Sequence, residues 1–138
     1  MKSFLLLLII VVFNQNENNL KKELKCSDFR NGKFELINLK NNKKFVIERH
    51  DEVQSEETYN LENGEMIGSK RFFKIKWISD CEYNILVDTV KTKCDKIDLY
   101  INSKGGVNTK IISIENNCAN VGSTFENKTI EAKLCKIN

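Results

Sequence analysis

The sequence of 138 residues contains no Cys-x-x-Cys pair and only one histidine, His50. A thioredoxin-like redox site and a zinc ribbon both need cysteines at that spacing, so both lack their signature. Any metal site would depend on scattered thiols, and we therefore expect neither a metal nor a cofactor. Proline is also absent, which by itself identifies no activity.

The chain has no apolar run long enough to span a membrane comfortably, since such a helix needs about 20 apolar residues. Its one unbroken apolar run is Phe4–Phe13, which follows Lys2 and precedes an asparagine-rich stretch from Asn14. A charged start, a short apolar run and a polar stretch are typical of an export signal. We predict an export signal over residues 1–19 and a secreted or periplasmic product, with an uncleaved N-terminal membrane anchor as the second choice. No small-x-small triplet follows Phe13, so the cleavage site stays open.

A strong excess of one charge is missing too, because the formal net charge is only +3. Acidic residues gather between Glu48 and Glu65, where seven acids stand against one arginine. Basic residues alternate with aromatic ones at 70–76, which superficially resembles a nucleic-acid-binding stripe. We interpret these lysines as the solvent-facing side of a strand, and we expect no nucleic-acid partner.

Residues 20–138 are enough for a single domain with one core. Apolar and polar residues alternate at 73–77 and 83–87, which is the period of a strand with one buried face. Similar or less regular patterns cover 34–39, 43–49, 53–61, 97–101, 107–114 and 130–134. Asparagine- and glycine-rich turns separate these segments. We predict an all-β domain, a single antiparallel meander of about eight strands closed as a small barrel, with a sandwich as the second choice.

The segment around Trp77 and Tyr83 predicts its own hairpin register. A loop with an odd number of residues pairs Trp77 with Tyr83 and Ile75 with Ile85, and it keeps the apolar side chains on one face. A two-residue turn would place Glu82 opposite Trp77. We therefore expect an odd loop or one long bent strand, with both aromatic rings in the core.

Three short segments carry a resemblance to a known group of proteins. The segment Lys76–Tyr83 (KWISDCEY), with Cys26–Phe29 and Asn31–Phe34 before it, resembles a family of short exported bacterial proteins, generally of unknown function. Arg49 and the Gln-x-Glu that begins at Gln54 also match. The family is similar in architecture to a small lipocalin-like barrel. Some members are named topoisomerase IV, but this chain lacks the basic residues around a nucleophilic tyrosine, the acidic metal cluster and the large domains that such an enzyme needs.

Five cysteines in an exported domain predict disulfides, and their spacing alone leaves the pairing open. The resemblance implies a bridge between Cys26 and Cys81. The pairing of Cys94, Cys118 and Cys135 stays open. Cys135 faces away from the apolar side of its strand, so we expect it to be the free thiol.

No residue pattern indicates catalysis, because His50 lies in a charged turn and no other nucleophile or base stands out. We expect no enzyme. Two function classes remain: a barrel that binds a small amphipathic ligand, and a structural or protein-interaction module of the cell envelope with a packed interior. Membrane contact is expected only through an uncleaved N-terminal segment.

Arg49, Gln54 and Glu56 are the candidate ligand-binding residues. Arg49 shares a face with Phe45 and Ile47, and Gln54 shares one with Glu56. One hypothesis places Arg49 and Glu56 at the barrel rim as a cross-strand ion pair. The other directs Arg49 and Gln54 into a partly open barrel, where they fix the polar end of an amphipathic ligand.

Overall fold

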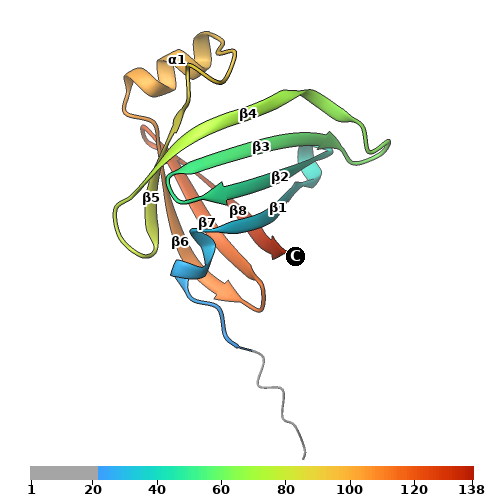
Figure 1. Cartoon of the computed structure of the whole chain (residues 1–138), viewed down its shortest axis with the longest axis vertical. Helices are drawn as coiled ribbons and strands as arrows, with labels where there is room; N and C mark the ends of the chain where they lie inside the picture. The colour runs from blue at the N-terminus through green and yellow to red at the C-terminus, as the bar shows by residue number, and fades with distance from the viewer. Residues whose placement is uncertain (1–21) are drawn as a thin grey trace, which may run out of the picture.

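The computed structural model describes residues 22–138, so the predicted export signal lies outside the described residues. Eight antiparallel strands follow one another around a closed barrel, in which the last strand pairs with the first (Figure 1). The strands are β1 (Gly32–Asn38), β2 (Lys43–His50), β3 (Val53–Asn60), β4 (Met66–Trp77), β5 (Glu82–Val87), β6 (Val107–Glu115), β7 (Cys118–Phe125) and β8 (Lys128–Ile137). The prediction of an all-β meander closed as a barrel is confirmed, and the sandwich is not formed.

One predicted strand is wrong. Residues 97–101 lie in the helix α1 (Lys96–Ser103), between β5 and β6. The helix starts with a capping box, in which the Asp95 carboxylate accepts from the Asp98 N–H and the Asp98 carboxylate accepts from the Asp95 N–H. The apolar residues at 97, 99 and 101 cannot distinguish a strand from a single short helix, and the cap decides.

The sequence interpretation also missed a strand, β7. Its residues are mostly small or polar (CANVGSTF), so they lack the bulky alternation that marks the other strands. Alternation is nevertheless present, because Ala119 and Val121 are buried in the core. Pairing with β6 on one side and β8 on the other holds β7 in the sheet. The number of strands therefore agrees with the prediction, although β7 takes the place of the strand expected at 97–101.

The β4–β5 hairpin has the predicted odd register. Trp77 pairs with Tyr83 and Ile75 with Ile85. The two aromatic rings lie 4.6 Å apart, and Tyr83 is almost completely buried. Both rings point into the barrel, as the alternation of their strands requires.

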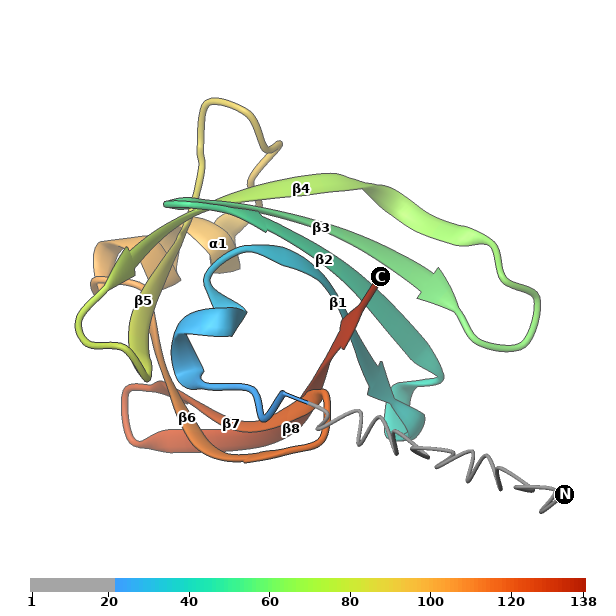
Figure 2. The ribbon, with the colours of Figure 1, turned by 60° about the horizontal axis from the view of Figure 1, so that its bottom comes forward.

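The core lies toward one end of the barrel, which is closed by the N-terminal 3-10 turn η1 (Cys26–Phe29). Figure 2 shows η1 inside the ring of strands. Phe29 is completely buried and stacks on Phe34, with 5.6 Å between the ring centroids. We call η1 the plug, because its phenylalanine fills this end of the interior.

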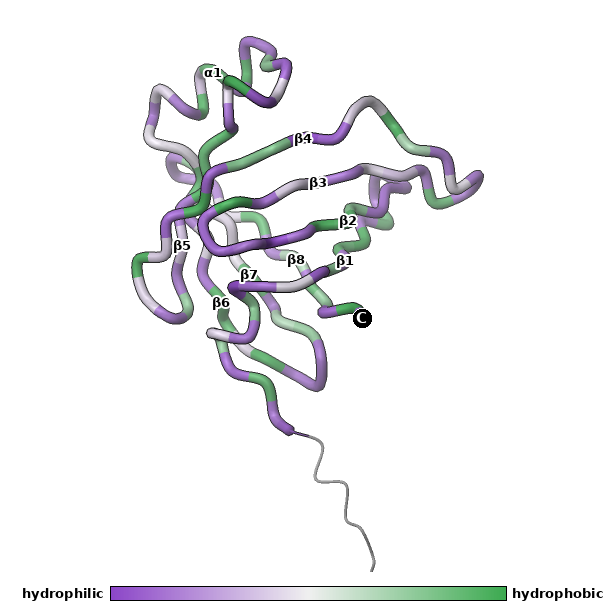
Figure 3. The backbone as a smooth tube through the Cα atoms, in the orientation of Figure 1, coloured by the Kyte–Doolittle hydropathy of each residue, from purple (hydrophilic) through white to green (hydrophobic). Residues whose placement is uncertain are grey.

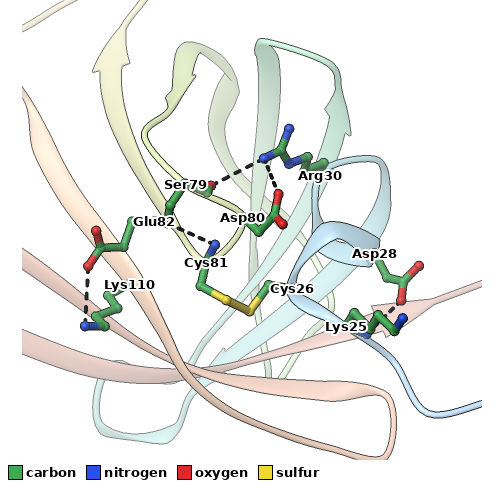
Figure 4. Close-up of a disulfide and its surroundings, with 9 residues drawn as sticks. All are labelled: Lys25, Cys26, Asp28, Arg30, Ser79, Asp80, Cys81, Glu82 and Lys110. Carbon is green, nitrogen blue, oxygen red and sulfur yellow. Dashed lines mark hydrogen bonds and ion pairs between the residues drawn. A yellow bond between two sulfur atoms is a disulfide. The ribbon is translucent and has the colours of Figure 1, made fainter.

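Two attachments hold the plug against the β4–β5 loop (Figure 4). Cys26 is bonded to Cys81, the pairing that the family resemblance implied. Next to this disulfide, the Arg30 guanidinium forms an ion pair of 2.9 Å with Asp80. A bridge across 55 residues restricts the unfolded chain and keeps the plug near its seat.

The expectation that Cys135 is free is wrong, because it forms a second disulfide with Cys118. Cys135 does face outward, but Cys118 lies directly opposite it on β7 and faces outward as well. Facing away from the core therefore brought the two thiols together instead of isolating one. Cys94 is the free cysteine. Two disulfides fit a protein that matures in an oxidising compartment. Within residues 22–138, no helix is long and apolar enough to cross a membrane.

Candidate functional site

Arg49 lies inside the barrel under the plug, with only 3% of its surface exposed. Strand alternation places it on the inner face of β2 together with Ile47. Its Nε donates to Gln54 Oε1 at 2.8 Å, Nη1 to the Phe29 carbonyl at 3.0 Å, and Nη2 to the Tyr83 hydroxyl at 2.8 Å. Each guanidinium nitrogen thus already has a protein acceptor.

Aromatic rings complete the surroundings of this guanidinium. Its central carbon lies 4.5 Å from the ring centroid of Tyr83, 5.4 Å from that of Phe34 and 6.0 Å from that of Trp77. No salt bridge joins Arg49 to a carboxylate within residues 22–138. Neutral acceptors and the electron-rich faces of the rings therefore stabilise the buried positive charge.

The hypothesis of an Arg49–Glu56 ion pair at the rim is wrong. Strand register places Gln54 opposite Arg49, whereas Glu56 lies opposite Ile47, one step further along the barrel. Arg49 and Gln54 do point into the barrel. Their facing polar groups bind each other, and the remaining arginine nitrogens bind the plug and Tyr83. This end of the interior is consequently packed with protein groups.

The opposite end of the barrel is more open. Pairing between β1 and β8 ends at Leu36 and Leu134, although β1 continues to Asn38 and β8 begins at Lys128. Beyond this point the side chains on the inner face are only partly buried. They include Leu36, Phe45 and Phe73, and Ile130 is 73% exposed. We call this region the open end.

Two charged side chains lie on the inner face at the open end. Glu56 of β3 and Arg71 of β4 occupy paired positions. The Arg71 guanidinium lies 5.3 Å from the Phe73 ring and forms an ion pair through Nη2 with Asp98 of α1. Burial raises the pKa of the Glu56 carboxyl above its ordinary value, and the Arg71 charge opposes part of that rise. Within residues 22–138, the Glu56 side chain forms no hydrogen bond or salt bridge.

A groove of about 1120 Å³ lies elsewhere, beside the residues that lead into the plug. Lys22–Leu24, the β6–β7 turn and the end of β8 line it. Of its two lysines, Lys22 and Lys136, the second already donates to the carbonyls of Asp28 and Asn31. We place the candidate site at the open end instead, because within residues 22–138 its inner face combines partly buried apolar side chains with the Glu56 carboxyl, which burial affects and no hydrogen bond uses.

The fold and this site define a small disulfide-bonded β-barrel with one plugged end and one open, amphipathic end. No family model, curated protein or solved structure was found to match the chain. The function must therefore be inferred from the arrangement of the chain's own residues.

Among the predicted site residues, the structure separates Glu56 from Arg49 and Gln54. Arg49 and Gln54 lie under the plug, while Glu56 lies at the open end. Sequence reasoning missed Arg71, although it has the same odd numbering as the inward-facing residues Phe73 to Trp77. It also missed Asp98, because the segment that carries it was assigned to a strand.

Proposed function

We propose that the protein is an exported barrel that binds a small amphipathic molecule at its open end. The observation that supports this most directly is the composition of that end. Partly buried apolar side chains of β1, β2 and β4 share the inner face of the barrel with Glu56, a carboxyl whose pKa is raised by burial and which has no hydrogen-bond partner in residues 22–138. Such a carboxyl reduces stability unless a ligand uses it. Eight-stranded barrels are of the size that can hold one small molecule.

The charged pair suggests how the ligand would lie. Within the described residues, Arg71 uses only Nη2 for a hydrogen bond, so Nε and Nη1 remain able to donate. A carboxylate or carbonyl at the polar end of the ligand would accept from these nitrogens. Glu56, when protonated, could add a further donor. The apolar part of the ligand would then lie against Leu36, Phe45 and Phe73, where it would displace water from partly exposed hydrophobic surface.

Arg49 and Gln54 have a different role in this proposal. They fix the plugged end by binding the plug, each other and Tyr83, and they do not contact the ligand. A rigid closed end helps to keep the strands at the open end in a defined arrangement. Export is supported by the two disulfides, which persist in oxidising compartments outside the cytosol.

The first test is native mass spectrometry of the exported protein purified from its own host, which should reveal a co-purifying small molecule. The second is calorimetric titration with decanoate, an amphipathic carboxylate. We expect Arg71→Met to weaken decanoate binding about tenfold or more, which corresponds to the loss of one charge-assisted hydrogen bond. Lys70→Met is the matched control, since Lys70 is the preceding residue of β4 and pairs with Glu57 on the outer face.

The binding experiment can contradict the proposal in two ways. If decanoate binds equally well to the wild type and to the Arg71 variant, the charged pair does not hold it. If neither a co-purified molecule nor decanoate binding is found, the open end is a structural feature and the protein belongs to the class of packed interaction modules.

A further inference from the structure

The helix α1 turns its polar side toward the barrel and its apolar side toward solvent. Asp98 and Asn102 face the barrel, where Asp98 is only 8% exposed. By contrast Ile97 is 68% exposed, Leu99 53% and Tyr100 47%. A surface helix normally does the opposite, burying its apolar side against the core. Figure 3 shows the hydrophobic positions of α1 at one extremity of the molecule.

Specific contacts hold α1 and the preceding loop in this inverted orientation. Asp98 forms an ion pair with Arg71 of β4. Asn102 binds β5 twice, since its amide nitrogen donates to the Val87 carbonyl and its amide oxygen accepts from the Val87 N–H at 2.9 Å each. In the loop, the Thr92 hydroxyl exchanges hydrogen bonds with the backbone of Phe72 on β4. These contacts use the polar side of the helix. On the apolar side Tyr100 packs against Phe125 of β7, and Ile97 and Leu99 stay exposed.

Basic residues flank the exposed apolar ones. The stretch 90–104, which we name the α1 segment, contains Val90 with 89% of its surface exposed. Its four lysines are all exposed and lie at positions 91, 93, 96 and 104. The segment has two acids, of which Asp98 is paired with Arg71 and Asp95 caps the helix. One further acid, Glu126 of the β7–β8 turn, meets this face at the Tyr100 hydroxyl. The four lysines outnumber it, so the accessible face is apolar with a net positive charge.

We propose that the α1 segment docks the protein on an anionic membrane surface. Lysine side chains would bind the lipid phosphates, while Val90, Ile97 and Leu99 would enter the boundary between headgroups and acyl chains. Tyr100 takes no part in this insertion, because its hydroxyl donates to Glu126 at 2.7 Å and its ring packs edge-on against Phe125 of β7. This membrane contact is separate from any contact made by the N-terminal segment, and it does not depend on the ligand proposed for the barrel.

The shape and charge of the segment favour a membrane over a protein partner. The segment projects from the barrel (Figure 1), which suits an extended surface better than insertion into a pocket. A second copy of the chain is the competing occupant, because the β3–β4 turn carries Glu62 and Glu65 next to the exposed Met66 and Ile67. Such a head-to-tail contact would produce open-ended assemblies, and self-association would reveal it.

The test is co-sedimentation of the full exported protein with phosphatidylcholine vesicles that contain or lack phosphatidylglycerol. We expect binding only to vesicles with phosphatidylglycerol, and weaker binding at high salt. Each of the substitutions Lys96→Gln and Lys104→Gln should lower the partition coefficient about fivefold. Ile97→Asp should lower it on the order of tenfold, through lost apolar burial. The matched control is Leu39→Asp with Lys40→Gln, which makes the same changes in an exposed turn far from α1 in sequence.

Several results would overturn this proposal. Binding that α1-segment variants leave unchanged would assign membrane contact to another part of the chain, such as the N-terminal segment. Equal binding to both vesicle types would remove the role of the lysines. Absence of vesicle binding, combined with self-association that Ile97→Asp abolishes in sedimentation velocity, would identify a second copy as the occupant. Glu56→Gln should keep vesicle binding whatever its effect on decanoate, which separates this proposal from the one for the barrel.

Discussion

Replacement of Arg49 by methionine tests the role of the plugged end most directly. Methionine has a similar length but no donors, so the substitution removes three hydrogen bonds and leaves Gln54 Oε1, the Phe29 carbonyl and the Tyr83 hydroxyl without their donor. An unsatisfied buried polar group costs roughly 1–3 kcal/mol. The lost cation–π contacts add about 0.5–2 kcal/mol. Against this, removing a buried charge recovers several kcal/mol of desolvation free energy.

The net expectation for Arg49→Met is a loss of a few kcal/mol in the free energy of unfolding, because three acceptors left without a donor and the lost cation–π contacts outweigh the recovered desolvation free energy. Urea unfolding is a suitable assay, since Trp77, the only tryptophan, lies 6.0 Å from the guanidinium and reports on this end of the barrel. Lys44→Met is the matched control on the same strand. Lys44 belongs to a partly exposed pair with Glu35, so its loss should cost less than about 1 kcal/mol.

A double-mutant cycle with Tyr83→Phe separates the network from general packing. Because Arg49 and Tyr83 share a hydrogen bond, the double variant should lose less stability than the two single variants together, by about 0.5–3 kcal/mol. If Arg49→Met costs no more than the Lys44 control with an unchanged denaturant slope, the guanidinium does not hold the plug. The inference about the closed end would then be refuted.

Three further predictions concern the site, the fold and the processing of the chain. The pKa of Glu56 is raised in the folded state, so folding loses stability as the pH rises from the pKa of the unfolded chain through the pKa of the folded one. Glu56→Gln should therefore raise the urea midpoint at pH 7, and this gain should vanish in acid. A higher midpoint at every pH would contradict that origin. Gly106→Ala should lower the free energy of unfolding by about 3 kcal/mol or more, because φ is +85° and the new Cβ would lie 2.3 Å from the Ile85 carbonyl oxygen. Gly64→Ala has open space around the new Cβ and should cost only about 1 kcal/mol. Comparable losses at both positions would exclude the clash. Mass mapping should find a mature chain that begins between about Phe13 and Leu24, and soluble cytosolic protein that still starts at Met1 would reject export.

The sequence by itself determined the strand architecture wherever a bulky apolar side chain occupies every second position. Trp77, Tyr83 and their neighbours predicted both the hairpin and its register, because a shift by one residue would turn the whole set away from the core. The same argument failed where the pattern was short or its side chains small. The helix α1 can be told from a strand by its capping box, and β7 can be recognised as a strand through its pairing with β6 and β8.

Only the tertiary structure decided which polar residues meet. Alternation showed that Arg49 points inward, but strand register selected Gln54 as its partner and directed Glu56 to Arg71. Both the carbonyl of Phe29 and the carboxylate of Asp98 come from segments far from these strands in sequence, and local pattern contains no information about such approaches. The cysteines obey the same rule. Cys135 is bonded because the register of the β7–β8 hairpin sets Cys118 directly opposite it, and that register is a property of the paired strands, not of either strand alone.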